Sequence, residues 1–197
     1  MTCNTVCKSL YKTFGKRIFD LLVAVCLLIL FSPLFIIIAV LIKYDSKGNV
    51  IYKQSRVGMN KEAFVIYKFR TMVSNADEIG PKFTSSNDIR ITRVGRFLRK
   101  TSLDELPQLV NVVLGDMSLV GYRPGVKENY HDLSEKTKNF SLKPGITGYA
   151  QINGRSTLNL EKRRYWENKY TEDISFVTDL KILFKTVLIA ITGRGSN

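Results

Sequence analysis

The sequence contains few of the residues on which common metal and acid–base sites depend. It has one histidine, His131, and three cysteines, Cys3, Cys7 and Cys26, all of which precede residue 27. Because no cysteine lies farther along, the sequence argues against a disulfide framework, and without a second pair of ligands a zinc site is not expected. The cysteine usage is typical of a reducing compartment, and a single histidine argues against histidine-based catalysis.

Several phosphate-binding and hydrolytic motifs are also absent. The chain has no GxxxxGK[ST] loop, no GxGxxG after a strand, no HExxH and no Ser-His pair. Acidic residues are in deficit, 17 against 30 basic ones, which gives a formal charge of +13. This balance favours polyanionic partners such as nucleic acid, phospholipid head groups or phosphorylated substrates, and the length of 197 residues predicts one compact domain.

One long apolar run is present. It extends over Leu21–Ile42, 22 residues without a formal charge, which reaches the roughly 20 residues that span a bilayer as a helix. Pro33 lies near its midpoint, where the ring clashes with the carbonyl of Ile29 and predicts a kink or break. Ser32 could donate a hydrogen bond to a carbonyl freed there. A signal peptide is not favoured, because its apolar part would be shorter, about 7–15 residues, and would end in a small-residue cleavage site.

Basic residues flank the run on both sides. A simple span should have basic residues mainly on its cytoplasmic side. Two half-helices that meet at Ser32-Pro33 and return to the cytoplasmic face would explain both the proline and the symmetric charge, whereas a kinked spanning helix is the alternative. Asp20, at the start of the run, is expected to pair with Lys16 or Arg17 in a structural role. The flanking residues are Lys8, Lys12, Lys16 and Arg17 before the run, and Lys43, Lys47, Lys53 and Arg56 after it.

The composition changes after the run, so we divide the chain into an N-terminal segment with a membrane helix, residues 1–44, and a cytoplasmic, membrane-associated part, residues 45–197. Two strands, Val50–Gln54 and Phe64–Phe69, are typical of a small β-hairpin, and residues 73–90 are typical of a long loop. The predicted fold class is therefore α+β and mostly helical. Helical patterns follow over Arg93–Lys100, Leu103–Leu114, Val126–Lys138 and Leu158–Tyr170.

The last helical pattern is amphipathic. Apolar residues recur at helical spacing from Phe176 to Ile191, while Asp179, Lys181 and Lys185 fall mostly elsewhere. This face would pack either into the core or onto a membrane as an interfacial helix.

The segment RKTSLDELPQLVNVVLGDMSLVGYRPG, residues 99–125, carries the strongest chemical candidates. Ser102 and Glu105 have the spacing of a capping box, which predicts a helix from Leu103 with Asp104 in its first turn. There the helix dipole and free N–H groups would keep Asp104 ionised beside an anion site. Asp104 could attack phosphorus or hold a divalent cation, or it could be an exposed acid in a well-capped helix.

Arginines bracket Asp104 in the sequence. Arg99 precedes it and Arg123 follows it in a loop flanked by glycines, and a guanidinium suits phosphate because it forms two parallel hydrogen bonds. Lys68 and Arg70, at the end of the second strand, would add positive charge. Arg99 is the last of four arginines spaced three residues apart, after Arg90, Arg93 and Arg96. Most of the four could instead lie on a surface that faces solvent or lipid head groups and have no role in the site.

Together these residues resemble the monotopic phosphoglycosyl transferases, the bacterial sugar transferase family. The resemblance covers about residues 14 to 190, and its length is similar to that of the small members with a catalytic domain alone. Seven segments in order make it specific: KRIFDLLVA, LFSP, YKQSRVGMN, FVIYKFRTM, TSLDELPQLVNVVLGDMSLVG, KPGITGYAQINGR and SFVTDLKIL.

The resemblance implies transfer of a sugar-1-phosphate from a UDP-sugar to a polyprenyl phosphate such as undecaprenyl phosphate, with release of UMP, as the first membrane step of glycan assembly. It implies that Asp104 is the nucleophile that forms a phosphosugar intermediate and that Glu105 is its dyad partner, with Mg²⁺ beside both. Arg99, Arg123 and Pro124 match phosphate- and nucleotide-binding positions, and Ser32-Pro33 matches the family's re-entrant break. The expected location is the bacterial inner membrane, with the active site on its cytoplasmic face and anionic phospholipid as a further partner.

The chain departs from the family at one position, because Tyr122-Arg123-Pro124 stands where Pro-Arg-Pro is usual. The pose of Arg123 is therefore open, and Tyr122 could stack on the uracil base. The identity of the UDP-sugar, the glycan pathway, the preferred polyprenyl length and the oligomeric state do not follow from the sequence.

Two other readings of the residues stay open. One is a membrane-tethered, non-catalytic protein that binds anionic lipid or nucleic acid, although few aromatics interleave with the basic run and no nucleic-acid partner is expected. The other is a metal-dependent transferase without a covalent intermediate, in which Asp104 and Glu105 only hold the metal.

Overall fold

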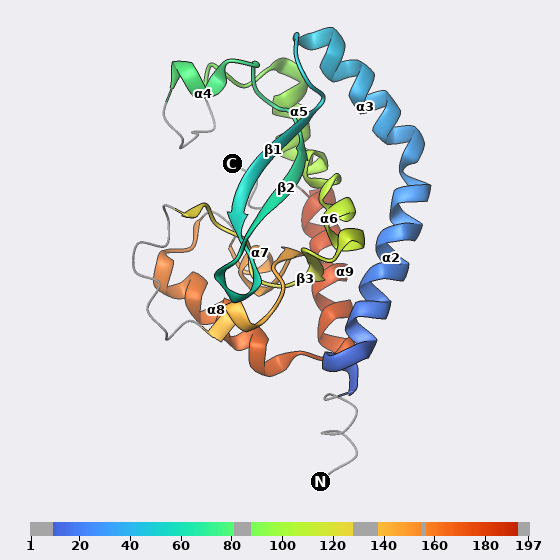
Figure 1. Ribbon diagram of the computed structural model, residues 1–197, viewed down its shortest axis with the longest axis vertical. Coiled ribbons are helices and arrows are strands. Elements are labelled where there is room, and N and C mark those ends of the chain that lie inside the picture. The colour runs from blue at the N-terminus through green and yellow to red at the C-terminus, as the bar shows by residue number, and fades with distance from the viewer. Residues whose placement is uncertain (1–9, 81–87, 128–137, 155–156, 193–197) are drawn as a thin grey trace.

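The computed structural model describes residues 10–80, 88–127, 138–154 and 157–192. Helices dominate it, and α2 (Lys16–Leu30) and α3 (Ser32–Asp45) form a bent rod along one side of the molecule (Figure 1). The prediction of a mostly helical α+β fold is confirmed. The other helices are α4 (Ala76–Ile79), α5 (Arg93–Thr101), α6 (Gln108–Leu114), α7 (Tyr149–Ile152), α8 (Leu160–Asp173) and α9 (Phe176–Thr192). Short turns of other helical types cover Tyr11–Gly15, Met59–Lys61, Leu103–Glu105 and Lys138–Ser141.

The predicted hairpin is present. Strands β1 (Ile51–Val57) and β2 (Ala63–Phe69) pair antiparallel, with Ile51 opposite Phe69, so β1 runs three residues beyond the predicted end at Gln54. A second pair, β3 (Ser118–Val120) and β4 (Gly145–Thr147), is parallel and was not predicted. Strands of three residues are too short to show an alternating pattern.

The bend between α2 and α3 confirms the predicted break. The two helices meet at Phe31 with a change of direction of 60°. The hydroxyl of Ser32 donates a hydrogen bond of 2.8 Å to the carbonyl of Ile29, the acceptor that Pro33 cannot serve. Within the described ranges no unbroken helix is long and apolar enough to cross a membrane, whereas the bent pair together meets that test by length and composition.

Both halves of the bent rod pack against the rest of the molecule. Ala24 of α2 is fully buried in the main core, where it joins Leu109 and Val112 of α6. Ile42 of α3 lies in a second cluster with Phe69 of β2 and Leu98 of α5. The N-terminal segment is thus integrated into the fold through its inner face.

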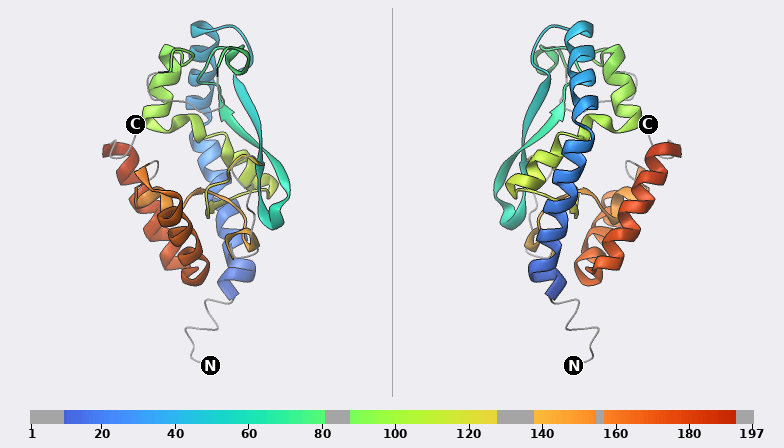
Figure 2. Two further views of the ribbon diagram at one scale, coloured as in Figure 1. Left: turned by 90° about the vertical axis from the view of Figure 1, so that its left-hand side faces the viewer. Right: turned by 90° about the vertical axis from the view of Figure 1, so that its right-hand side faces the viewer.

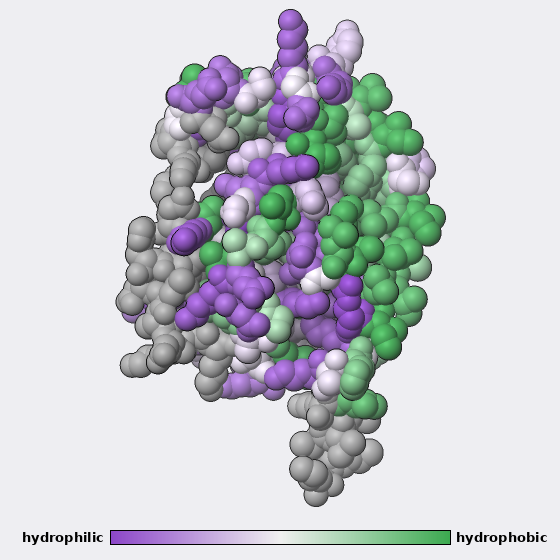
Figure 3. Space-filling view, in the orientation of Figure 1, coloured by the Kyte–Doolittle hydropathy of each residue, from purple (hydrophilic) through white to green (hydrophobic). Residues whose placement is uncertain are grey.

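The outer face of the rod is apolar and exposed. Ile29 of α2 is 69% exposed and Ile36 of α3 is 67% exposed. Figure 3 shows a continuous hydrophobic surface along this side of the molecule. Helix α9 also exposes apolar side chains, including Phe184 and Val187, so its amphipathic pattern is confirmed. Contiguous apolar surface of this kind marks an interface with protein or membrane.

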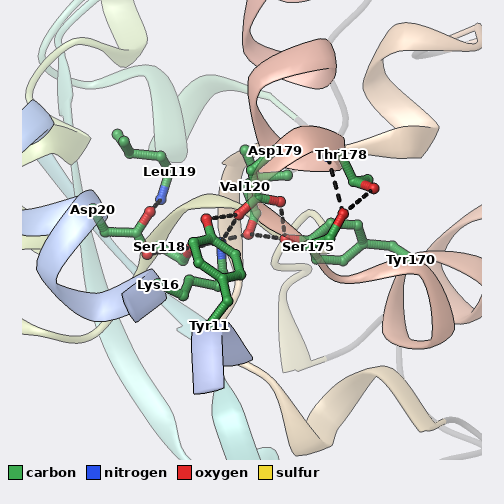
Figure 4. Close-up of polar contacts among 10 residues, drawn as sticks. All are labelled: Tyr11, Lys16, Asp20, Ser118, Leu119, Val120, Tyr170, Ser175, Thr178 and Asp179. Atoms are coloured by element: carbon green, nitrogen blue, oxygen red, sulfur yellow. Dashed lines mark hydrogen bonds and ion pairs between the residues drawn. The ribbon is translucent and has the colours of Figure 1, made fainter. Parts of the chain in front are cut away.

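A buried polar network joins the two ends of the chain (Figure 4). Asp179 of α9 is 0% exposed and accepts hydrogen bonds from Tyr11 (2.7 Å), Lys16 (2.7 Å) and Tyr170 (2.6 Å). Asp20 accepts from the hydroxyl of Ser118 at 2.7 Å and lies 3.8 Å from the Lys16 ammonium, which confirms the predicted structural pairing. The network therefore ties α2 to α8, α9 and β3.

One predicted helix is wrong in its first part. Leu103–Leu114 was predicted as one helix from a capping box, but Leu103–Glu105 forms a separate 3₁₀ turn and α6 begins at Gln108. Ser102 instead ends α5 in a left-handed conformation (φ 58°), which differs from the extended backbone of an N-cap, and its side chain makes no capping bond. Of the other predicted segments, α4 lies within the 73–90 loop, and Val126–Lys138 falls mostly outside the described residues.

Candidate active site

A cavity of about 1310 Å³ lies beside the β-hairpin and brings together most of the predicted site residues. Asp104 and Glu105 line it, and they are its only acidic residues within the part of the chain that the structure describes. The cavity is otherwise rich in cations. The predicted residues Arg99, Arg123, Lys68 and Arg70 all line it, whereas Pro124 does not.

Four separate segments deliver these side chains. Lys68 comes from the end of β2, and Arg99 comes from the last turn of α5. The 3₁₀ turn that follows α5 carries Asp104 and Glu105, and Arg123 lies three residues after the end of β3. The left-handed Ser102 reverses the chain between α5 and this turn. Arg99 and the two carboxylates can therefore face the same cavity although they are close in sequence.

Glu105 is held by two cations. The Lys68 ammonium lies 2.7 Å from its Oε1, and Arg123 lies 2.7 Å from Oε1 and 3.3 Å from Oε2. Burial alone would raise the pKa of Glu105, but the charges and hydrogen bonds of Arg123 and Lys68 outweigh burial and lower this pKa below its usual value. Glu105 is therefore ionised and fixed in place.

Asp104 is in a different state. No hydrogen bond to its carboxylate is found among the described residues, and the side chain is only half-buried at the cavity wall. Burial and the charge of Glu105 raise the pKa of Asp104 to about 6, while Lys68, Arg99 and Arg123 limit the rise. At neutral pH the group is mostly ionised and has oxygen lone pairs open to a ligand.

The predicted reason for the charge of Asp104 is wrong. Asp104 does not lie in the first turn of an α-helix, and α6 begins four residues later and has only 7 residues. The negative charge of Asp104 is therefore balanced by cationic side chains and not by a helix dipole. This matters chemically because those cations can also contact a phosphate, which accepts charge-assisted hydrogen bonds.

Two cationic candidates have different degrees of freedom. The Nε of Arg99 donates a hydrogen bond of 2.8 Å to the Thr71 hydroxyl, which fixes the Nε end of the guanidinium. Burial lowers the pKa of Arg99 from its usual range. Arg70 is buried and donates to the carbonyls of Ser46 (2.8 Å) and Lys47. Arg70 thus holds the segment after α3 and has less freedom than Arg99 to bind a ligand.

The structure of the loop around Arg123 contradicts the prediction for Tyr122. Tyr122 is only 2% exposed and packs edge-on against Phe140, with ring centroids 5.5 Å apart, so the idea that it stacks on a base is wrong. The Tyr122 ring instead anchors the loop in a small core. Pro124 is buried, and its carbonyl accepts from Arg56 at 3.3 Å. Both neighbours therefore position Arg123 through packing.

Sequence reasoning did not assign three of the arginines that line the cavity to the site, namely Arg56, Arg90 and Arg163. Arg163 donates to the carbonyl of Arg123 at 3.2 Å and to Glu167 at 3.1 Å. Arg56 binds Gln54 at 2.6 Å in addition to Pro124. Arg56 lies in a segment that carries the family resemblance, which was a signal of its importance, but Arg163 lies in a highly charged helix and gave no such signal.

The metal that the resemblance implies, Mg²⁺, can be compared with this donor set. Mg²⁺ prefers one or two carboxylates together with phosphate oxygens and water. Asp104 fits this preference, whereas the oxygens of Glu105 already accept from Lys68 and Arg123. No group of three His, Cys, Asp or Glu side chains comes together within the described ranges. The site therefore fits Mg²⁺ when a diphosphate supplies the remaining oxygens.

Comparison with known proteins gives a consistent result. The family described as "Bacterial sugar transferase" matches residues 11–193. The exopolysaccharide production protein ExoY of Rhizobium meliloti is 40% identical over 199 residues, which cover 92% of this chain and 88% of that protein. The uncharacterized sugar transferase EpsL of Bacillus subtilis is 40% identical over 181 residues, 91% of this chain and 89% of that protein.

A longer relative is named for its reaction. The UDP-glucose:undecaprenyl-phosphate glucose-1-phosphate transferase of Escherichia coli K12 is 44% identical over 191 residues, which cover 92% of this chain but 41% of that protein. The chain thus spans nearly all of ExoY and less than half of the Escherichia coli enzyme. The match extends over α2 and the segments that form the cavity as well as α9, and on these grounds the chain belongs to the bacterial sugar transferase family.

Proposed function

We propose that this protein is a phosphoglycosyl transferase that moves a sugar-1-phosphate from a UDP-sugar to a polyprenyl phosphate, such as undecaprenyl phosphate, and releases UMP. Relatives named for transfer of a sugar phosphate to undecaprenyl phosphate support the general reaction. The cavity supports it too, because cations suited to phosphate surround a carboxylate that has no other partner among the described residues. This open carboxylate, Asp104, carries the proposal.

In the first step an Asp104 oxygen attacks the phosphorus that bears the sugar. A bond forms between that oxygen and phosphorus, and the bond between phosphorus and the oxygen bridging to the uridine phosphate breaks. UMP leaves with the bonding electrons, and the sugar phosphate stays on Asp104 as an acyl phosphate. Lys68, Arg99 and Arg123 are placed to stabilise the charge on the phosphoryl oxygens during this displacement.

In the second step a phosphate oxygen of the polyprenyl phosphate attacks the same phosphorus. The acyl-phosphate bond breaks, Asp104 returns as a carboxylate, and the sugar leaves on the lipid as a diphosphate. Glu105 is held away from a nucleophilic role by Lys68 and Arg123. It acts as the charge partner that keeps both cations next to Asp104. Bound Mg²⁺ would neutralise diphosphate charge from the Asp104 side.

The bent rod supports a membrane location. We infer that α2 and α3 enter the membrane, turn at Ser32-Pro33 and return to the cytoplasmic face of the bacterial inner membrane. The exposed apolar outer face, the 60° bend and the internal partner of Ser32 favour this arrangement. Basic residues at both ends of the rod would then meet anionic head groups, and α9 would lie at the interface with its exposed apolar side chains.

The topology can be tested in intact cells. Thr5→Cys, introduced after the native cysteines have been changed to serine, should resist an impermeant thiol reagent added from outside and react after the cells are opened. Tyr44→Cys, at the other end of the rod, should behave in the same way. Labelling of Thr5→Cys from outside would exclude the hairpin.

The covalent route can be tested without a lipid acceptor. Labelled UMP should exchange into a UDP-sugar in the presence of Mg²⁺, because the first step is reversible when the lipid is absent. The exchange should disappear in Asp104→Asn. Robust exchange in that variant would contradict the role of Asp104, and absence of exchange in the unmodified protein, with transfer to lipid intact, would favour a direct transfer. A panel of UDP-sugars in the same assay identifies the donor.

A further inference from the structure

The active-site cavity has two chemically different ends. One end holds Asp104 and the cations around it. Where α2 and α9 line the other end, the lining residues are apolar except for Thr186, whose hydroxyl is already bonded to Thr147 and to the carbonyl of Ile182. We call this end the apolar arm and define it by Leu27, Phe31, Leu183, Val187 and Ala190. A single continuous cavity thus places a cationic site next to a hydrophobic one.

The walls of the apolar arm come from α2 and α9. The two helices contact each other near their N-terminal ends, where the rings of Phe19 and Phe176 lie 5.3 Å apart. Figure 2 shows that they diverge from there toward their C-terminal ends. The wall residues of α9 lie in its C-terminal half, and those of α2 lie at its C-terminal end. The apolar arm therefore lies in the wedge between the diverging helices.

The bend of the rod is part of this wall. Phe31, the residue at which α2 ends and α3 begins, lines the cavity, whereas Ser32 and Pro33 do not. The N–H of Phe31 donates to the carbonyl of Leu27 at 2.9 Å, so Phe31 continues the helical face that carries Leu27, four residues earlier. The end of α2 therefore supplies an aromatic side chain to the same wall of the active-site cavity.

The apolar arm continues onto the exposed apolar surface. Val187 both lines the cavity and is 56% exposed, and its neighbour Phe184 is also exposed. On the opposite wall, Ile29 and Leu30 are exposed next to Phe31. Exposed apolar side chains therefore adjoin the cavity lining on both helices, next to Val187 and next to Phe31.

We propose that the apolar arm binds the isoprene units of the polyprenyl phosphate that lie nearest its phosphate. This inference rests on the proposed function and adds where the lipid substrate lies. The occupant must carry an anionic group for Lys68, Arg99 and Arg123 and a hydrocarbon chain for the apolar arm. Of the two substrates only the lipid acceptor has both, because a UDP-sugar has no hydrocarbon chain. The arm then delivers the lipid phosphate to the phosphosugar on Asp104.

A kinetic test uses a large side chain to fill the apolar arm. Ala190→Trp should raise the KM for undecaprenyl phosphate at least tenfold, and it should lower the rate of UMP exchange, which needs no lipid, by much less. Leu188→Trp is the matched control, because Leu188 is exposed on the same helix and does not line the cavity. An unchanged lipid KM in Ala190→Trp, or an equal rise in Leu188→Trp, would overturn the proposal.

A binding test separates this inference from the proposed function, because it needs no turnover. In Asp104→Asn, a polyprenyl phosphate with a diazirine in the isoprene unit next to the phosphate should cross-link to peptides that contain the apolar arm. Undecaprenyl phosphate should compete, and phosphatidylglycerol in equal amount should not. Cross-links confined to the outer face of α3, or equal competition by phosphatidylglycerol, would overturn the inference. Loss of exchange in the unmodified protein would count against the proposed function alone.

Discussion

Asp104 and Glu105 are neighbours in the chain but have opposite electrostatic surroundings. Glu105 receives hydrogen bonds from two cations, while Asp104 receives none within the described residues. The shift in the pKa of Asp104 to about 6 follows from burial and from the charge of Glu105. The two carboxylates thus have different roles, since Glu105 fixes the cations and Asp104 remains available for chemistry.

The pH dependence of the first step follows from this pKa. In the proposed first step the ionised form of Asp104 attacks phosphorus, so the rate of UMP exchange should fall as the pH drops through the pKa of Asp104, which is about 6 in the free protein and which Mg²⁺ bound to this carboxylate would lower. Arg99→Gln removes one cation that favours the charged form and should move this inflection to higher pH. Exchange rates measured between about pH 5 and 8 check both expectations. An exchange rate that does not fall at low pH would contradict the role of Asp104 as the attacking carboxylate.

The contribution of Asp104 to the free energy of unfolding should change with pH in the opposite direction to its contribution to the exchange rate. The pKa of Asp104 is raised in the folded state, so its protonated form stabilises the fold at low pH, and this contribution is lost as the pH rises through about 6. At pH 7 the charged group is destabilising. Asp104→Asn should therefore raise the free energy of unfolding by roughly 1–2 kcal/mol while exchange is lost.

Glu105→Gln is the matched comparison for that variant. It removes the charge that holds Lys68 and Arg123 and leaves the two cations without their anion, so the melting temperature should fall. Thermal unfolding in detergent at pH 7 measures both variants. If Asp104→Asn lowered the melting temperature as much as Glu105→Gln does, the electrostatic description of the pair would be wrong.

Several site residues could be predicted from the sequence because they lie in one segment with unusual chemistry. Asp104 is an acid between Arg99 and Arg123, and Lys68 ends a recognisable strand. Arg163 could not be found in this way, because its place at the cavity depends on packing of α8 against a loop 40 residues away. The burial of Tyr122 was equally hidden, since Phe140, its partner, is distant in sequence.

At the scale of elements, the bend at Phe31 depends on local chemistry that sequence could show. Pro33 removes a donor, and the Ser32 hydroxyl takes over the carbonyl of Ile29 at 2.8 Å. Ser32→Ala should therefore cost about 1 kcal/mol, because the hydrogen bond from the hydroxyl to the carbonyl of Ile29 is lost. Ser32→Thr keeps the hydroxyl and should cost less. Thermal unfolding of both variants in lipid nanodiscs checks this order.

The helix start predicted near Asp104, unlike the bend at Phe31, was wrong. Ser102 and Glu105 have the spacing of an N-cap, but Ser102 is needed as the left-handed end of α5. One residue cannot adopt both conformations, and the C-terminal role prevails because it turns the chain back toward the cavity. Local spacing therefore found the correct residues but assigned the wrong backbone around them. The parallel pair of β3 and β4 also escaped prediction, because it joins strands that are far apart in sequence.

At the scale of the whole molecule, the network around Asp179 connects residues from both ends of the chain. Asp179→Ala would leave Lys16, Tyr11 and Tyr170 without their shared acceptor in a buried site. We expect a loss of about 3–5 kcal/mol in the free energy of unfolding. Lys185→Gln, on the exposed side of α9, is the control and should change stability by less than about 0.5 kcal/mol. Similar melting temperatures for the two variants would show that the network is not needed for stability.

The sequence predicted the general architecture but not how its parts contact each other. Composition and periodicity indicated a bent apolar segment, a hairpin and amphipathic helices. They could not show that Ala24 lies in the same core as Val112, because such contacts depend on long-range packing. The division at residue 44 stays a prediction.

The hydrogen bond between Tyr11 and Asp179 joins residues 168 positions apart. During synthesis on the ribosome, the helix that is made first must wait for almost the whole polypeptide before its lysine and tyrosine find their acceptor. Until α9 has been made, these two side chains lack the acceptor that they share in the folded protein. Completion of the fold is thus coupled to completion of translation, and a chain interrupted before α9 would lack the acceptor shared by Tyr11, Lys16 and Tyr170.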